Sequence, residues 1–357
     1  MARVLVGRGH DLAFAGRPEM VPRVRTAGFR AIEIKQAYRQ LDGYPTGSHL
    51  TRMACYLTSP AVEAEIRDIV AAEAPDLLLI DGMFPAALIQ AAELGIPAVV
   101  FVHTFVFRQL DMWRRIFATF SDMRQKAGHS PLPSLDDLWR PRERLISTSL
   151  GAFDAPPQDG WSHVVHVGPA LEDEKFAVPT PLPWPDDDTR PLALVSFSTG
   201  FEQRNVDKVQ RTLDALADAP LRVVATTGGI VAPSEVAAPA NAIVLDYAAH
   251  DPILARAAVV VGHGGHGTAM RAMRHGVPMA IIPGVAGDQP YVAAAIDEWG
   301  AGVALPADAA PEAIRDAVDR LIAEPRYRAE ARRRAAALAG VDGATAAAAE
   351  VEATLAN

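Results

Sequence analysis

Residues 259–268 read VVVGHGGHGT, an apolar run that meets four glycines and two histidines. Continuous apolar runs of this kind are typical of parallel strands that are buried on both faces. A stretch of helical period follows as far as His275, and residues 276–278, Gly-Val-Pro, then lead into a further apolar run. A strand, a glycine-rich turn and a helix in this order form one unit of a parallel α/β sheet. The segment therefore predicts an α/β domain built around it.

The same alternation of strand and helix patterns occurs in two separate series. The N-terminal series has apolar runs at 76–81 and 98–102, joined by a helix predicted over 85–94. The C-terminal series contains a helix predicted over 205–217 and five strands, predicted at 192–197, 222–226, 242–246, 258–262 and 279–282. Two Rossmann-like domains of the α/β class follow from this pattern.

A proline-rich acidic segment separates the two series. Residues 172–191 hold prolines at 179, 181, 183 and 185 and three consecutive aspartates at 186–188, which is typical of a stiff, exposed linker. We expect an N-terminal domain over 1–171, this linker, a C-terminal domain over 192–340, and a helical tail over 341–357.

Composition excludes several classes of protein. The chain has 357 residues, of which 34 are Lys or Arg and 43 are Asp or Glu, and its formal charge is −9. An acidic chain without a basic stripe is a poor partner for nucleic acid. The single cysteine, Cys55, excludes an internal disulfide and a cysteine-built metal site. No apolar run is long enough for a membrane span, and no signal peptide is apparent, so we expect a cytoplasmic protein without stable membrane insertion.

The glycine-rich turn predicts a binding site for a phosphate. Glycines let the backbone approach a ligand closely, and the N–H groups and dipole at a helix N-terminus favour an anion. His263 and Thr268 add side-chain donors at the same place. The alternative is a tight turn in which the glycines only relieve crowding.

A zinc site at His263, His266 and His275 is a further reading of this segment. We reject it because the glycines prevent a rigid helical face for the first two histidines, and no carboxylate or cysteine completes the set. His275 is more simply the end of a helix before its glycine cap. We therefore expect no metal and no cofactor.

Several motifs of the C-terminal half occur together and are specific as a set. They are Asp246-Tyr247 with Pro252-Ile253-Leu254, His263-Gly264-Gly265 with Thr268, Gly276-Val277-Pro278, and Pro283 followed by Asp288-Gln289-Pro290. In these motifs the chain resembles the nucleotide-sugar glycosyltransferases of the GT-B fold, especially the UDP-glycosyltransferase-like bacterial enzymes that glycosylate natural products. The resemblance implies two Rossmann-like domains facing across a cleft, with the donor held mainly by the second.

The resemblance also implies which residues bind the donor. His263 and the amides of Gly265, Gly267 and Thr268 would hold the diphosphate, and Asp288 and Gln289 would bind sugar hydroxyls; Tyr247 falls near the nucleobase and Thr199 near a phosphate. From the residues alone, Asp288 is also a plausible N-cap ahead of Pro290, a role that can coexist with sugar binding. Thr199 is more simply part of a turn after a strand.

In the N-terminal half, the resemblance gives a catalytic role to Asp81, which follows an apolar strand and would orient a histidine base. The alternative is an N-cap for the helix predicted from Pro85. Aromatic and methionine side chains near residues 105–120 would suit a flat lipophilic acceptor, although packing in the core explains them as well. The acceptor contacts that we expect are Phe84, His103, Phe105 and Trp113.

The start of the chain departs from the family pattern. Residues 6–15 resemble the junction before the family's second strand, so we expect the first strand, its loop and the usual catalytic histidine to be absent. A rival reading takes residues 3–6 as that first strand, but the next strand would then follow too soon for a parallel crossover. His10 we expect in a turn, away from the ligand edge of the sheet.

These features imply an inverting, metal-independent transfer of a sugar from a UDP- or dTDP-sugar to a hydroxyl of a small lipophilic acceptor, such as a polyketide-type natural product. The missing base keeps a second class open, a donor-binding auxiliary or an inactive homologue. A third class is a nucleotide-sugar epimerase or hydrolase. The expected partners are the donor and the small-molecule acceptor, with the chain a monomer or a homodimer.

Overall fold

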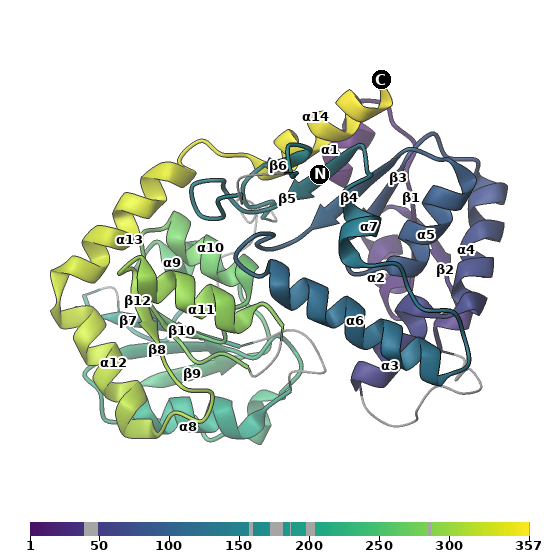
Figure 1. Ribbon diagram of the computed structural model, residues 1–357. Helices are drawn as coiled ribbons and strands as arrows, with labels where there is room; N and C mark the ends of the chain where they lie inside the picture. The colour runs from purple at the N-terminus through teal and green to yellow at the C-terminus, as the bar shows by residue number, and fades with distance from the viewer. Residues whose placement is uncertain are drawn as a thin grey trace. The chain divides into compact units, whose positions relative to one another are not determined.

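The computed structural model describes residues 1–38, 49–156, 160–171, 181–185, 187–197, 204–284 and 287–356. The chain divides into two compact units. The first comprises residues 1–170 together with 342–357, and the second comprises residues 171–341. Both contain a parallel sheet with helices (Figure 1), so the α/β fold class predicted from the sequence is confirmed.

The second unit contains a six-stranded parallel sheet in the order β12-β11-β10-β7-β8-β9. Counted along the chain, this order is the doubly wound one, in which the direction of winding reverses between the first and fourth strands, here β7 and β10. The strands are β7 (Leu192–Ser196), β8 (Arg222–Thr226), β9 (Ala242–Leu245), β10 (Ala257–Gly262), β11 (Met279–Ile281) and β12 (Gly302–Ala304).

The helices of this unit connect its successive parallel strands, except for the two that follow β12. They are α8 (Val206–Leu216), η3 (Pro233–Glu235), α9 (His250–Leu254), α10 (His266–Arg274), α11 (Gln289–Glu298), α12 (Pro311–Ala323) and α13 (Pro325–Leu338). Gly276 ends the segment after α10 with a φ of +62°, and a Cβ there would lie 2.8 Å from Arg332 Cγ. The helix can therefore pack closely on α13 only with glycine at this position.

The first unit contains a four-stranded parallel sheet in the order β3-β4-β5-β6 and a separate parallel pair, β1-β2. The strands are β1 (Ala13–Gly16), β2 (Arg30–Glu33), β3 (Leu78–Asp81), β4 (Ala98–Val102), β5 (Arg144–Ser147) and β6 (Val164–His166). The helices are α1 (Ala2–Gly7), α2 (Met20–Thr26), η1 (Lys35–Tyr38), α3 (His49–Thr58), α4 (Pro60–Glu73), α5 (Pro85–Leu94), α6 (Leu110–Lys126), α7 (Leu135–Trp139) and α14 (Gly343–Leu355).

The C-terminal helix α14 belongs to the first unit, although its sequence follows the second. It lies beside α1 (Figure 1), and Ala347, Ala348 and Val351 pack with Leu5 and Ile146 in one apolar cluster. Gly343 approaches the carbonyl of Gly168 so closely that a Cβ would collide with it. The segment that we expected as a tail is thus part of the core of this unit.

The first residues of the chain are helical. Residues 3–6 lie in α1, so the rival interpretation of them as a strand is wrong. His10 lies between α1 and β1, and its Nε2 is 3.0 Å from Glu352 Oε1 on α14. His10 therefore faces the C-terminal helix.

Half of the predicted linker, residues 172–180 and 186, lies outside the described residues. Among the helices that the structure does describe, none combines the length and the apolar character needed to cross a bilayer.

Candidate functional site

The carboxyl ends of the central strands bring the predicted donor residues to one edge of the second sheet. Gly262, the last residue of β10, pairs with Ser196 at the end of β7 and with Ile281 at the end of β11. Residues that follow these strands therefore emerge side by side, at the point where the winding of the sheet reverses. Open α/β sheets bind ligands at this position.

The glycine-rich turn has the geometry that an anion site requires. Gly264 has a φ of +83°, and a Cβ on it would lie 2.8 Å from Ile281 Cγ2. Gly265 is the N-cap residue of α10, and the first N–H groups of a helix have no partner within the helix. Among the described residues, and apart from its chain neighbours and the backbone of α10, no heavy atom lies within 4 Å of the position that a Cβ on Gly267 would occupy. Within the part of the chain that the structure describes, the N-terminus of α10 is thus open at Gly267.

His263 lies directly behind this turn. A Cβ on Gly265 would lie 2.5 Å from His263 Nε2, so the imidazole can occupy its place only beside a glycine. Burial lowers the pKa of His263 from its ordinary value, and the charge of Lys208 acts in the same direction, while the Ser196 backbone and the charge of Asp288 oppose it. The net lowering favours a neutral imidazole in the free protein.

Asp288 and Gln289 follow β11 at the same edge of the sheet. Asp288 occupies the N-cap position of α11, but its side chain makes no capping hydrogen bond, so the structure gives no support to the alternative of a capping role. Gln289 is buried, and its Oε1 accepts a hydrogen bond from the Gly284 amide at 2.6 Å. The amide group of Gln289 is therefore held in a fixed orientation, and the Asp288 carboxylate lies close enough to His263 to affect its pKa.

The remaining predicted donor residues are placed as follows. Thr268 lies in the first turn of α10 and is half-buried. Tyr247 comes two residues after β9, the edge strand, and is 67% exposed. Thr199 lies outside the described residues.

In the first unit, Asp81 and His103 lie at the ends of the neighbouring strands β3 and β4. His103 Nδ1 is 3.9 Å from Asp81 Oδ2, and both side chains are about half exposed. Asp81 Oδ1 accepts a hydrogen bond from the Met83 amide at 2.8 Å. Helix α5 takes Phe84 as its N-cap residue, so Asp81 closes the turn before the helix and does not cap it.

Two of the predicted acceptor contacts need correction. Phe105 is 0% exposed and Trp113 is 3% exposed. Trp113 Nε1 donates a hydrogen bond to the Phe105 carbonyl at 3.2 Å, which ties both residues into the core. Trp113 lies on the buried side of α6, which packs against α3 and α7, and Phe105 precedes that helix. Phe84 is half-buried, with its ring 4.9 Å from that of Tyr56.

Sequence reasoning missed three residues beside these sites. Burial raises the pKa of Tyr56 above its ordinary value, and the charges of Arg17 and Asp81 also act on it. Tyr56 therefore lies near Asp81, and the Arg17 guanidinium lies over the Tyr56 ring, 5.8 Å from its centroid. No motif marks either residue in the sequence. Lys208 is buried in the first turn of α8, and a lysine so soon after a strand-to-helix loop is a signal that could have been used.

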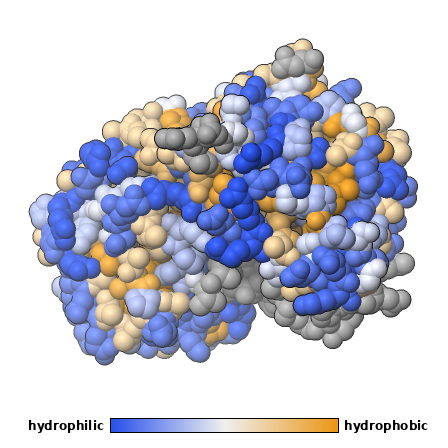
Figure 2. Space-filling view, in the orientation of Figure 1, coloured by the Kyte–Doolittle hydropathy of each residue, from blue (hydrophilic) through white to orange (hydrophobic). Residues whose placement is uncertain are grey.

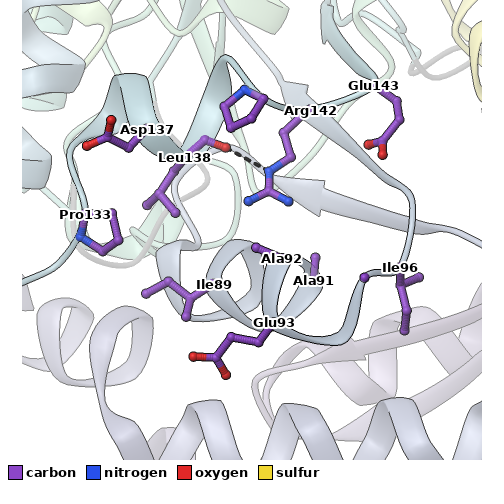
Figure 3. A pocket seen from close by; sticks show the side chains of 12 residues that line it. Ile89, Ala91, Ala92, Glu93, Ile96, Pro133, Asp137, Leu138, Arg142 and Glu143 are labelled. Atoms are coloured by element: carbon purple, nitrogen blue, oxygen red, sulfur yellow. Dashed lines mark hydrogen bonds between the residues drawn. The ribbon is translucent and has the colours of Figure 1, made fainter.

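A pocket of about 430 Å³ lies elsewhere in the first unit (Figure 3). Its wall includes Arg142, whose guanidinium donates to the carbonyls of Leu138 and Leu88 at 2.9 and 3.1 Å. Figure 2 shows hydrophobic residues at the surface over α5, which forms another wall. None of the predicted site residues lines this pocket. Within the described ranges, no group of three or more His, Cys, Asp or Glu side chains is placed to hold a metal ion.

Comparisons with known proteins agree with this arrangement. Residues 210–353 match the family described as erythromycin biosynthesis protein CIII-like, C-terminal domain. The NDP-glycosyltransferase YjiC of Bacillus subtilis (strain 168) is 24% identical over 98% of this chain and 91% of its own length. The solved structure of the calicheamicin glycosyltransferase CalG4 has a TM-score of 0.76 at 24% identity. The matched region covers 99% of this chain and 93% of the CalG4 chain.

A second solved structure, the glycosyltransferase VinC in complex with dTDP, has a TM-score of 0.71 at 22% identity. The matched region covers 99% of this chain and 94% of the VinC chain. At such identities the likeness establishes the fold alone. The family resemblance and the GT-B type of fold that the sequence predicted are confirmed by these comparisons.

Proposed function

We propose that this protein is a glycosyltransferase of the natural-product type, which moves a sugar from a nucleoside diphosphate to a hydroxyl of a small lipophilic acceptor with inversion at the anomeric carbon. The observation that carries the proposal is the open N-terminus of α10, with His263 behind it and Asp288 nearby. The likeness of the chain to glycosyltransferases along nearly its whole length supports the same class of enzyme.

The second unit would bind the donor. Amides of Gly265, Gly267 and Thr268 face the diphosphate in this proposal, and the dipole of α10 stabilises its negative charge. His263 donates a further hydrogen bond to the diphosphate, whose negative charge would raise the pKa of the imidazole. Asp288 and Gln289 supply the acceptor and donor groups that sugar hydroxyls require, and Tyr247 offers an exposed ring to the nucleobase.

Chemistry follows from charge development at both ends of the reacting bond. A base takes the proton of the acceptor hydroxyl, the oxygen attacks the anomeric carbon, and the bond to the diphosphate breaks. The helix N-terminus and His263 stabilise the charge on the leaving diphosphate, so no metal is needed for that step. In the first unit, Asp81 orients the imidazole that acts as the base, and His103 is the imidazole that faces it in this structure.

Calorimetric titration with UDP and with dTDP tests the proposal. We expect one of them to bind and His263→Gln to weaken that binding about tenfold or more, because a hydrogen bond to a charged group is lost. Gly267→Ala should weaken binding as well, since its Cβ enters the space that the phosphate would fill. His275→Gln, at the other end of α10, serves as the control and should leave the affinity unchanged.

Turnover distinguishes the alternatives. Transfer should require both donor and acceptor. Consumption of a UDP- or dTDP-sugar without any acceptor would instead indicate an epimerase or a hydrolase, and binding without turnover over a broad acceptor panel would indicate a donor-binding auxiliary. Absence of binding by either nucleotide would contradict the proposal as a whole.

A further inference from the structure

Lys208 is a buried cation that the proposed mechanism leaves without a role. It is the third residue of α8 and is only 9% exposed. Its Nζ donates hydrogen bonds to the carbonyls of Ile282 and Pro283, at 3.3 and 3.1 Å. Burial lowers the pKa of Lys208 from its ordinary value, and the nearby charge of Arg211 adds to this effect. Because burying an ammonium group is costly, its position here calls for a specific reason.

The two carbonyls that Lys208 binds belong to the junction between the two halves of the donor site. The Ile282 amide donates to the carbonyl of Gly262 at 2.8 Å, and Gly262 immediately precedes His263. The Gly284 amide donates to Gln289 Oε1 at 2.6 Å. Lys208 therefore binds a three-residue segment, 282–284, that contacts the phosphate side of the site at one end and the sugar side at the other.

We propose that Lys208 is a positioning residue for sugar recognition, which holds segment 282–284 in place so that Gln289 and its neighbour Asp288 keep the orientation needed to bind the sugar of the donor. This inference rests on the proposed function. Arg211 on the same helix provides a comparison. It also donates a hydrogen bond to a main-chain carbonyl, that of Ala307 at 3.3 Å, and Ala307 lies outside segment 282–284. Comparing the two variants therefore separates a general effect of losing a hydrogen bond from α8 to a main-chain carbonyl from an effect at the donor site.

The test compares the Lys208→Met and Arg211→Met variants with the wild type. The probes are UDP or dTDP, whichever binds, and the sugar nucleotide of that base that binds most tightly from a panel of hexose donors. For Lys208→Met we expect affinity for the sugar nucleotide to fall about tenfold, while affinity for the nucleoside diphosphate changes less than about threefold. Arg211→Met should change neither affinity.

Hydrogen exchange provides a readout that needs no ligand. The Gly284 amide should lose protection in Lys208→Met because its bond to Gln289 depends on the position of segment 282–284. Protection in Arg211→Met should remain that of the wild type. If Lys208→Met does not fold, Lys208→Gln is the alternative variant, because it keeps an N–H donor group on a shorter side chain. We expect it to lose about threefold in affinity for the sugar nucleotide and none for the nucleoside diphosphate.

Three results would overturn the inference. Equal losses for the diphosphate and the sugar nucleotide would show that Lys208 acts on the phosphates or on folding. Unchanged affinities with an unprotected Gly284 amide would show that the segment does not govern sugar binding. Failure of the wild type to bind any nucleotide would contradict the proposed function itself, and this inference with it.

Discussion

His275 Nε2 lies 3.0 Å from Asp251 Oδ1, and Arg271 Nη1 lies 2.8 Å from the other oxygen of the same carboxylate. Asp251 is in the first turn of α9, whereas both partners belong to the C-terminal end of α10. The carboxylate thus ties the C-terminal end of α10, opposite the end at the donor site, to α9. His275, for which we expected no metal, contacts this carboxylate through a hydrogen bond.

Replacing this carboxylate should destabilise the protein in a pH-dependent way. Burial raises the pKa of Asp251, but His275 and Arg271 outweigh that effect and lower it. A carboxyl with a lowered pKa contributes stability above its ordinary pKa, and this contribution is lost as pH falls through the folded value. We therefore expect Asp251→Asn to reduce the free energy of unfolding by about 1–3 kcal/mol at pH 7, and by less at pH 3.

Urea unfolding at the two pH values measures this difference. The matched control is Asp319→Asn, which removes an exposed pair with Arg315 on one helix and should change stability by less than about 0.5 kcal/mol. A loss in Asp251→Asn that is equally large at both pH values would show that the charge of Asp251 is not what stabilises this contact.

The sequence predicted the second unit better than the first for a physical reason. Its strands are continuous apolar runs between turn signals, and the predicted 222–226 strand matches β8 to the residue. The three-residue strands β6 and β12 are too short to show such a run. Helix α14 was expected as a tail since alanines alone do not indicate which surface they cover.

The candidate site shows the same limit. The glycines and histidines of the turn at 262–268 can be recognised in the sequence as a candidate ligand site. Glycine is needed there for local reasons, namely a positive φ and the close approach of nearby atoms to the backbone. Burial of Phe105 and Trp113 and the position of Lys208 depend on contacts between residues far apart in the chain, such as Lys208 with Pro283. Residue type alone could not distinguish a ligand contact from core packing at these positions.

Two glycines of the same turn should respond to alanine in opposite ways. Gly264→Ala places a Cβ 2.8 Å from Ile281 Cγ2 at a φ of +83°, so we expect a loss of about 2 kcal/mol or more in the free energy of unfolding. Gly267→Ala meets no atom within 4 Å and lies in a helix, so stability should rise by up to about 1 kcal/mol. Thermal unfolding of the two variants without ligand measures both effects. Equal destabilisation would mean that Gly267 is not open as described.

Donor binding should draw a proton from solution. Burial holds the pKa of His263 below its ordinary value in the free protein, and a bound diphosphate would raise it again by its negative charge. Affinity for a UDP- or dTDP-sugar should therefore increase as pH falls from 8 to 6, since the complex binds more protons than the free protein. Calorimetry in buffers of different ionisation enthalpy detects this uptake. His263→Gln should remove it, and uptake that persists in this variant would assign it to another group.

Asp154 should anchor the loop after β4 that begins at His103. Its carboxylate is fully buried and accepts hydrogen bonds from the amides of Val106, Phe107 and Arg108 at 2.7 to 2.9 Å. His166 Nε2 lies 3.2 Å from Asp154 Oδ2. We expect Asp154→Ala to cost about 3–5 kcal/mol of stability, because several buried donors lose one acceptor. Denaturant unfolding measures this, with Asp122→Ala on the exposed side of α6 as the control; a cost below about 1 kcal/mol would contradict the anchoring role.

Replacing His103 should affect transfer and leave donor binding intact. Its Nδ1 faces Asp81 Oδ2 at 3.9 Å in the first unit, whereas the predicted donor residues belong to the second. We expect His103→Ala to lower kcat for transfer at least about a hundredfold, the usual contribution of a general base, with the Kd of the donor unchanged. Added imidazole should restore part of the rate in this variant, because a small base can take the proton in place of the missing side chain. His129→Ala in the same unit controls for general effects of losing a histidine, and a rate in His103→Ala that equals the wild type would assign the base to another residue.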